Sequence, residues 1–308
     1  MPQDQRHPSS VPVARPGLLG RLRSLWQPRR PLLPLHRIAS GRRARVEAEI
    51  RALAGAVPLG DAMLCRALGR YKLLVAPEDR GVAPHLALDG YWKFWVTAFL
   101  ARHLRPGQKL LEAGAGYGYF TLLAADLLGP GGQVLALEPN PRLATLLRQN
   151  VALNGFADRV RVERIALAGP AAPAYLPFKT PAEDPLASHL VEEGAAEPTA
   201  ARVPIRALDS FIGDRPDWLW LDLNGGEENA WAGMQALLAA QPGLRLLLEF
   251  DASRCHAPAA LLEALAGRFP LQRIGPDGEA RACTAESLLA GGTATLFLAP
   301  GQSVAARS

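Results

Sequence analysis

The sequence has few cysteines, few lysines and no long hydrophobic run. Its three cysteines, Cys65, Cys255 and Cys283, are widely spaced and odd in number among 308 residues, so they offer neither a disulfide framework nor metal-ligand spacing. We therefore expect reduced, buried thiols in a cytoplasmic protein, and no metal site. No apolar run approaches the roughly 20 residues that a membrane-spanning helix requires. Only four lysines occur, so arginine is the usual cation of this chain.

Acidic residues are scarce only at the start of the chain. Residues 1–51 contain eleven arginines and three acids, a balance of +8; the whole chain carries +5, so residues 52–308 carry 5 − 8 = −3. The isoelectric point near 9.4 is therefore a property of the N-terminal segment and not of the body. This distribution does not favour nucleic-acid binding by the body, and we expect no nucleic-acid partner.

Residues 1–40 are rich in proline, arginine and serine, which predicts a disordered basic arm. A solvated tail is the favoured interpretation, and a weak contact with an anionic membrane surface, a nucleic acid or an acidic partner is the alternative. The pair Arg29-Arg30 is followed by Pro31 and Pro34, which break up the apolar stretch that a twin-arginine export signal needs. At the other end, residues 301–308 are expected to be a frayed tail.

Residues 41–105 predict a small N-terminal cap built from a helix and a hairpin. The expected elements are a helix over 42–54, strands over 66–76 and 82–88, and a helix over 89–104. Trp92 and Trp95 fall on the apolar face of the last helix. A role in the core is favoured for them over stacking on a sugar or an adenine.

From residue 106 to residue 300, short apolar strands alternate with amphipathic helices. Strands are expected over 109–113, 134–138, 160–165, 218–223, 244–250, 269–274 and 293–299, and helices over 119–128, 141–153, 228–239 and 258–267. This alternation predicts an α/β fold, a doubly wound, mostly parallel, seven-stranded sheet with helices on both faces. Residues 168–201 interrupt it as an insertion, and loops at the carboxyl edge of such a sheet commonly form the substrate site.

The stretch KLLEAGAGYGYF, residues 109–120, is a strand that breaks into a glycine turn and continues as a helix. Glycine lets the backbone approach a bound molecule, and the start of the helix offers free N–H groups. A dinucleotide fingerprint requires G-x-G-x-x-G, but here Gly118 comes one residue early. Glu112 precedes the first glycine by two residues and fits a cationic nucleoside better than a pyrophosphate. A tight turn without a ligand is the alternative.

Acidic side chains end two further strands. Glu138 follows Gly118 by twenty residues, where an acid can accept both hydroxyls of a ribose, or can stabilise the start of the next helix. Asp222 ends the fourth strand and is followed by Asn224 and Glu227. Charged groups in such a turn require a ligand, a cation or backbone donors, and a helix N-cap is the competing interpretation.

In this order the motifs resemble those of the FkbM family of class I S-adenosylmethionine (SAM) methyltransferases. The matching segments span residues 110–250 and are Glu112–Thr121, Glu138–Pro141, Asn150–Gly155, Leu208–Phe211, Asp222–Glu227 and Leu247–Glu249. Asn224 stands where the family has Glu or Gln. The resemblance implies a Rossmann-like class I methyltransferase fold, SAM as cofactor, and methyl transfer to a hydroxyl of a sugar, a glycan or another small hydroxylated metabolite.

The resemblance also implies the residues of the site. The expected cofactor-binding residues belong to the glycine turn or to the carboxyl ends of strands, and they are Glu112, Gly114, Ala115, Gly116, Gly118, Glu138, Pro139, Asn140 and Asp222. Since methyl transfer to oxygen needs alignment and a base can assist it, Asp222, Glu227 and His189 are the candidate catalytic residues, with Glu249 a further candidate.

Three alternatives remain for the function. A metal-dependent O-methyltransferase would use Asp222, Asn224 and Glu249 as oxygen ligands. A non-catalytic SAM-fold protein would recruit a partner through its basic arm. A nucleic-acid methyltransferase that acts on an amino group would place an Asp/Asn-Pro-Pro-aromatic turn after the fourth strand, which this chain lacks.

Overall fold

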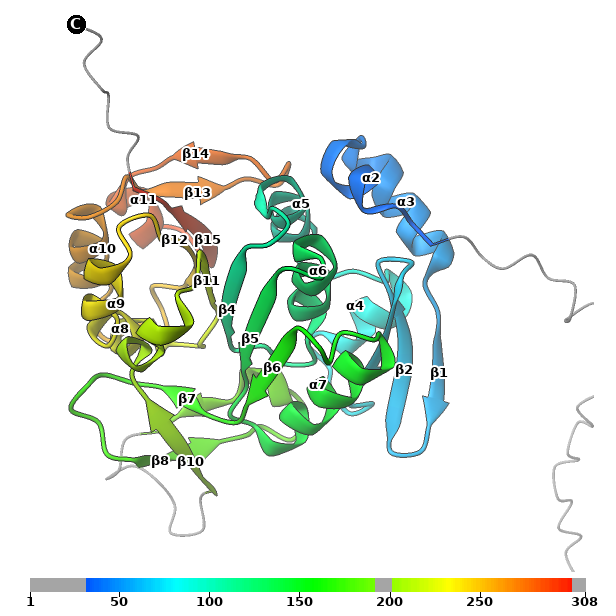
Figure 1. Cartoon of the computed structure of the whole chain (residues 1–308), viewed down its shortest axis with the longest axis horizontal. Helices are drawn as coiled ribbons and strands as arrows, with labels where there is room; N and C mark the ends of the chain where they lie inside the picture. Colours follow the sequence, from blue (N-terminus) through cyan, green and yellow to red (C-terminus); the bar gives the residue numbers. More distant parts are fainter. Residues whose placement is uncertain (1–31, 192–200, 301–308) are drawn as a thin grey trace, which may run out of the picture. The chain divides into compact units, whose positions relative to one another are not determined.

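A central sheet of eight strands organises the chain, whose computed structural model describes residues 32–191 and 201–300 (Figure 1). Its order is β14-β13-β15-β12-β11-β4-β5-β6, with β15 antiparallel to both of its neighbours and β14 antiparallel to β13. The strands are β4 (Lys109–Ala113), β5 (Gln133–Leu137), β6 (Val160–Glu163), β11 (Trp218–Leu221), β12 (Arg245–Phe250), β13 (Gln272–Ile274), β14 (Ala280–Ala282) and β15 (Ala294–Leu298). The expected α/β fold is confirmed, and β14 is a short edge strand added to the seven expected. Residues 1–31 of the expected arm and the tail 301–308 lie outside the described residues.

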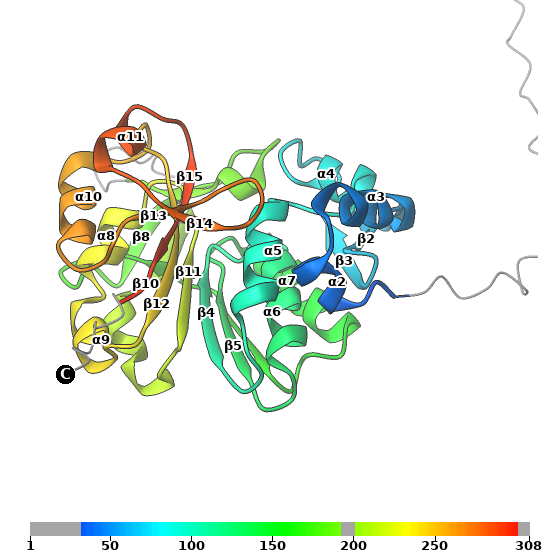
Figure 2. The same cartoon turned by 90° about the horizontal axis from the view of Figure 1, so that it is seen from above.

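Helices cover both faces of this sheet (Figures 1 and 2). Helices α5 (Phe94–His103), α6 (Tyr119–Leu128) and α7 (Pro141–Leu153) share one hydrophobic core. The other core contains η3 (Leu208–Asp214), α8 (Glu227–Ala232), α9 (Gln235–Ala240), α10 (Pro258–Ala266) and α11 (Ala285–Leu289). Strand β11 shows why the sheet is buried on both sides, because Trp218 and Trp220 enter the first core while Leu219 and Leu221 enter the second.

The N-terminal extension consists of helices and a separate antiparallel sheet of order β1-β2-β3. Its elements are α2 (Leu35–Ser40), α3 (Arg43–Leu53), β1 (Ala56–Leu59), β2 (Ala62–Ala67), β3 (Tyr71–Val75) and α4 (Ala83–Leu88). Helix α2 lies within residues that the sequence assigned to the arm, and its Ile38 is buried. The ordered part of the chain therefore begins before residue 40.

Two expected strands of the extension are wrong. Residues 66–76 do not form one strand, because Leu68 and Gly69 both have positive φ (50° and 62°) and turn the chain from β2 into β3. Residues 82–88 form helix α4 instead of a strand. The carboxylate of Asp79 accepts hydrogen bonds from the N–H groups of Gly81, Val82 and Ala83, and these bonds fix the turn that leads into the helix.

Two expected helices are shorter than the pattern suggests. Helix α5 begins at Phe94 and not at Asp89, because Gly90 and Lys93 have positive φ (74° and 40°). The helix expected over 228–239 is divided into α8 and α9 around Gly233. A Cβ at Gly233 would lie 2.8 Å from the carbonyl oxygen of Ala168, so the close approach of another segment interrupts the helix.

The insertion contributes a second small sheet, of order β7-β10-β8-β9. Its strands are β7 (Ala166–Leu167), β8 (Tyr175–Lys179), β9 (His189–Leu190) and β10 (Ala201–Arg206), with the short helix η1 (Pro185–Ala187) before β9. Strand β10 pairs antiparallel with β8 and parallel with β7, so the insertion returns beside the strand from which it departs. It stays at the carboxyl side of β6 and brings η1 to the end of the main sheet.

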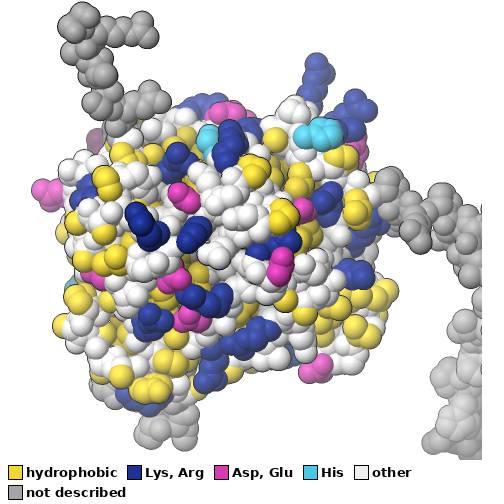
Figure 3. Space-filling model, in the orientation of Figure 1, with side chains coloured by type: hydrophobic (Ala, Val, Ile, Leu, Met, Phe, Trp, Pro, Cys, Tyr) yellow, Lys and Arg dark blue, Asp and Glu magenta, His cyan; other side chains and the backbone are white. Residues whose placement is uncertain are grey.

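On the face shown in Figure 3, basic and acidic side chains lie among hydrophobic ones. None of the helices in the described part of the chain has the length and apolar character needed to span a bilayer.

Candidate functional site

The candidate site lies where the parallel strands end. Strands β4, β5, β11 and β12 run in one direction, so their carboxyl ends meet at one edge of the sheet. Gly114, Glu138, Asp222 and Glu249 from these four strand ends line a single cavity of about 910 Å³. The insertion closes another side of this cavity with residues 184–190.

Three glycines shape the turn after β4, and each has a positive φ: 81° at Gly114, 55° at Gly116 and 88° at Gly118. A Cβ at Gly114 would lie 1.9 Å from the carbonyl oxygen of Asp222, and one at Gly118 would lie 2.3 Å from Leu147 Cδ1. A Cβ at Gly116 would lie 2.4 Å from Leu186 Cδ2 of η1. The turn is therefore packed between β11, α7 and the insertion, and side chains are excluded at all three positions.

Glu138 follows β5 with only 4% of its surface exposed. Its two carboxylate oxygens accept hydrogen bonds from the N–H groups of Gly116 and Asn140, both at 2.8 Å. Burial raises the pKa of Glu138 to about 7, although the two N–H groups oppose this effect. Each oxygen keeps a second lone pair, so a buried acceptor of ribose hydroxyls is available beside the glycine turn.

Glu112 occupies a different place from Glu138. It is 1% exposed, accepts a hydrogen bond of 2.5 Å from the hydroxyl of Thr121, and does not line the cavity. Burial raises the pKa of Glu112 to about 8. Of the nine residues expected to bind the cofactor, those that line the cavity are Gly114, Glu138, Pro139 and Asp222, and those that do not line it are Glu112, Ala115, Gly116, Gly118 and Asn140. Asn140 also caps α7, where its side-chain oxygen accepts from the N–H of Arg142 at 3.0 Å.

The three candidate catalytic residues line the same cavity but differ in their freedom to act. Glu227 at the start of α8 accepts the N–H groups of Leu223 (3.1 Å) and Gly225 (2.9 Å), one on each oxygen, and burial raises its pKa to about 7. This carboxylate therefore holds its own turn together. His189 is half-buried in β9, with its Nδ1 3.1 Å from the carbonyl oxygen of Ala187.

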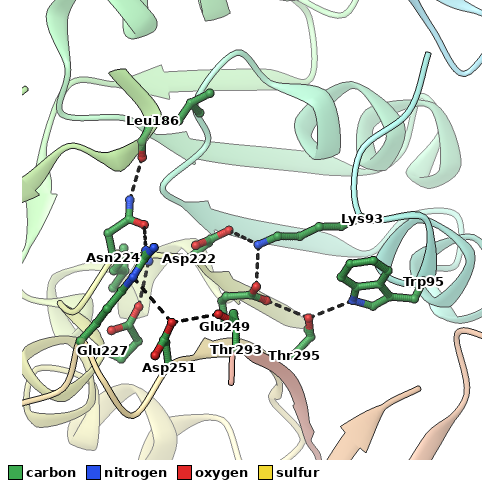
Figure 4. A network of polar contacts seen from close by, with 12 residues as sticks. Lys93, Trp95, Leu186, Asp222, Asn224, Glu227, Glu249, Asp251, Thr293 and Thr295 are labelled. Atoms are coloured by element: carbon green, nitrogen blue, oxygen red, sulfur yellow. Dashed lines mark hydrogen bonds and ion pairs between the residues drawn. The ribbon is translucent and has the colours of Figure 1, made fainter. Parts of the chain in front are cut away.

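Asp222 belongs to a network of charged and polar side chains, which is drawn in Figure 4. The ammonium of Lys93 lies 2.8 Å from Asp222 Oδ2 and 2.7 Å from Glu249 Oε1. The hydroxyl of Thr295 donates to Glu249 Oε2 at 2.8 Å, and the indole N–H of Trp95 donates to that hydroxyl at 3.3 Å. Within the described part of the chain, Asp222 Oδ1 has no such partner.

Sequence reasoning missed Lys93. It ends the stretch DGYWK, residues 89–93, whose aromatic residues indicate the apolar face of a helix, and it is one of only four lysines in the chain. The feature of the sequence that could have identified Lys93 is the position of a rare lysine directly before a buried helix. Trp92 and Trp95 were expected in the core, and the structure places both half-buried along the wall of the cavity.

The side chains expected to bind a metal in the metal-dependent alternative instead interact with basic residues of the protein. Lys93 lies between Asp222 and Glu249, and the side-chain oxygen of Asn224 accepts a hydrogen bond of 2.5 Å from Arg254. Among the described residues, no group of three or more His, Cys, Asp or Glu side chains has the geometry to hold a metal ion.

A glycine turn after the first strand, a buried acid after the second and the reversed strand β15 define the fold of the Rossmann-like class I methyltransferases. The family model described as the methyltransferase FkbM domain matches residues 112–264, so this part of the chain is a methyltransferase FkbM domain. SAM is the cofactor of such enzymes. The site fits it, since a buried carboxylate and a glycine turn adjoin a cavity of sufficient size.

Curated relatives match over a shorter region. Protein-L-isoaspartate O-methyltransferase of Aeropyrum pernix is 37% identical over 98 residues, which cover 29% of this chain and 38% of the relative. The protein of the same name from Methanopyrus kandleri is 38% identical over 93 residues, which cover 30% of this chain and 37% of the relative. The chain thus spans little more than a third of the length of these relatives.

Among solved structures, methyltransferase FkbM from Methylobacillus flagellatus is similar to this chain with a TM-score of 0.39. It is 15% identical, and the match covers 66% of this chain and 53% of that one.

Proposed function

We propose that this protein transfers the methyl group of SAM to a hydroxyl oxygen of a sugar, a glycan or another small hydroxylated molecule. Bound SAM supplies an electrophilic methyl group on a sulfonium centre. In this proposal, Glu138 accepts the ribose hydroxyls, and the turn from Gly114 to Gly118 supports the cofactor. The segment 184–190 lines the same cavity and, in this proposal, shields the reacting groups from water.

The observation that carries this proposal is the open oxygen of Asp222. Glu227 and Glu249 each use both carboxylate oxygens within the protein, whereas Asp222 Oδ1 has no donor among the described residues. The side chain of Asp222 is 26% exposed and lines the cavity. It is therefore the carboxylate best placed to accept the proton of an acceptor hydroxyl as its oxygen attacks.

A sugar is the favoured acceptor because two indole side chains, Trp92 and Trp95, line the cavity near Asp222. Such rings provide flat apolar surfaces for a sugar face. A carboxylate acceptor, as the name of the isoaspartate methyltransferases indicates for those relatives, fits less well. Asp222, Glu249 and Lys93 together carry a charge of −1, which disfavours a second anion at this place.

The test is methyl transfer from radiolabelled SAM to a panel of methyl glycosides, an isoaspartyl peptide and a catechol. We expect label in one or more glycosides, at a rate that a chelator such as EDTA does not change, since Lys93 already neutralises the carboxylates of the metal-dependent alternative. Label only in the isoaspartyl peptide would contradict the proposed acceptor. Loss of transfer in EDTA, restored by Mg²⁺, would favour the metal-dependent mechanism. A protein that binds SAM and methylates nothing would favour the non-catalytic alternative.

A further inference from the structure

Lys93 is held in an unusual backbone conformation at the start of α5. Its φ of 40° and ψ of 63° lie in the left-handed region, which a residue with a side chain adopts at a cost in free energy. Its carbonyl oxygen still accepts the N–H groups of Val96 and Thr97, at 2.9 Å and 3.1 Å, and so begins the helix. This conformation directs the side chain away from the helix and towards the ends of β11 and β12 (Figure 4).

The ammonium group is enclosed by carboxylates and aromatic rings. Only 11% of the side chain is exposed, and Nζ lies 5.9 Å from the ring centroid of Trp92 and 5.8 Å from that of Trp220. Burial by itself disfavours the charged amine, but Asp222 and Glu249 outweigh this effect, so the pKa of Lys93 is raised above its usual value. The amine is therefore a permanent charge over the working range of pH.

The two carboxylates that share this amine are not equivalent. Glu249 is 8% exposed, and its second oxygen accepts from Thr295, which Trp95 fixes in turn. It thus anchors Lys93 to the body of the sheet. Asp222 is bound by Lys93 through one oxygen only and presents the other without a donor in the described structure.

We propose that Lys93 is a positioning residue, which holds Asp222 in one orientation and supplies the positive charge that offsets the two carboxylates, so that the free oxygen of Asp222 can act on the acceptor. This inference rests on the proposed function, because it assumes that SAM and the acceptor occupy the cavity. Without the amine, Asp222 and Glu249 would be two neighbouring carboxylates in a confined site. One of the two would then take up a proton at a higher pH.

The other titratable groups around Asp222 bear on the test. They are Glu112 on β4 and Glu227 on α8, whose charges both interact with Asp222, in addition to Glu249 on β12 and Lys93 itself. Since all of these except Lys93 are unchanged between wild type and a Lys93 variant, the difference between the two proteins isolates the contribution of the amine.

The experiment compares the binding of SAM with that of S-adenosylhomocysteine, its neutral product, by calorimetry between about pH 5 and pH 8. In Lys93→Met, we expect the preference for SAM to rise by about threefold or more across this range relative to wild type, because an ionised Asp222 attracts the sulfonium and a protonated one does not. Lys93→Arg retains the charge and should resemble wild type. Lys72→Met, at an exposed position on β3, is the matched control for loss of a lysine.

If the preference for SAM over S-adenosylhomocysteine changes with pH in Lys93→Met as it does in wild type, this inference is overturned. The proposal that the protein binds SAM would not be affected by that result. Failure of the wild type to bind SAM would instead contradict the proposed function, and this inference with it. If Lys93→Met does not fold, Lys93→Met/Glu249→Gln removes the facing carboxylate as well. The same rise is then expected at lower pH, so the titration is extended to about pH 3.5. A preference that does not change over this extended range would contradict the role of Lys93. Once an acceptor is known, the acidic limb of the pH–rate profile should move to higher pH in Lys93→Met and return in Lys93→Arg.

Discussion

The ammonium of Lys93 lies 2.8 Å from Oδ2 of Asp222, across 129 positions of sequence. The first residue caps a helix that precedes the whole methyltransferase sheet, and the second ends the strand beside the glycine turn. The N-terminal extension is therefore part of the site, and the domain that begins near residue 106 does not contain all of its charged groups.

Asp222→Asn should lower the rate of methyl transfer by about 100- to 10,000-fold, because the amide retains the shape of the side chain but cannot accept a proton. SAM binding should weaken by only about threefold, because the variant loses the attraction of an ionised Asp222 for the sulfonium but keeps the backbone oxygen that lies against Gly114. Rates measured with a glycoside acceptor, together with calorimetry of SAM binding, test both statements. Asp158→Asn, at an exposed position, is the control. A variant that retains most of the wild-type rate would remove Asp222 from the mechanism.

Gly116→Val should abolish SAM binding. A side chain at this position is strained by the positive φ of 55°, and it meets Leu186 of η1, whose carbonyl oxygen is held by the side chain of Asn224 at 2.7 Å. The new side chain therefore strains the backbone of the turn and displaces the side chain of Leu186. Gly213→Ala is the matched control, because a Cβ there meets nothing within 4 Å and φ is not positive. Unchanged SAM affinity in Gly116→Val by calorimetry would contradict the assignment of this turn.

The main sheet and the glycine turn could be predicted because their signals are local. Strand β4, helix α6 and helix α7 have the expected bounds, since the apolar period and the residues that end each element lie within the element itself. The hairpin between β2 and β3 was missed for the opposite reason. Leu68 in its turn is an apolar residue with positive φ, and the sequence RALGRYKLLVA appears continuous without knowledge of the fold.

The sequence predicts which residues lie at the strand ends of the site, but it does not predict the hydrogen bonds and ion pairs among them. Parallel strands bring Gly114, Glu138 and Asp222 to one edge, and this follows from fold class alone. The spacing of the acidic residues does not show which carboxylate lacks a hydrogen-bond donor, because the donors lie elsewhere in the sequence. Glu227 is occupied by backbone N–H groups of its own turn, and Glu249 by Lys93.

The stability of the protein should decrease as the pH rises from about 4.5 to about 8. Burial raises the pKa of Glu112 from 4.5 to about 8, so the folded state retains a proton that the unfolded state releases. The contribution of Glu112 to the free energy of unfolding is fully present below pH 4.5 and is lost as the pH rises through the folded pKa. The loss is at most about 1.4 kcal/mol per pH unit. Glu112→Gln should reduce this slope, measured by urea unfolding at several pH values. Glu263→Gln, at an exposed position on α10, should leave it unchanged, and an equal slope in all three proteins would contradict the assignment.

Two truncations should separate the N-terminal segment into a dispensable and a structural part. Removal of residues 1–31 should leave the free energy of unfolding and SAM binding unchanged. Removal of residues 1–40 also deletes α2, with buried Leu33 and Ile38 and the carbonyl oxygen of Ala39 that accepts a hydrogen bond of 2.9 Å from Arg102 on α5. Loss of these contacts should destabilise the protein by about 2–5 kcal/mol. Since α5 carries Lys93 at its start, the longer truncation should also weaken SAM binding. Calorimetry and urea unfolding of both proteins provide the comparison, and equal stability of the two truncations would show that α2 is not part of the folded body.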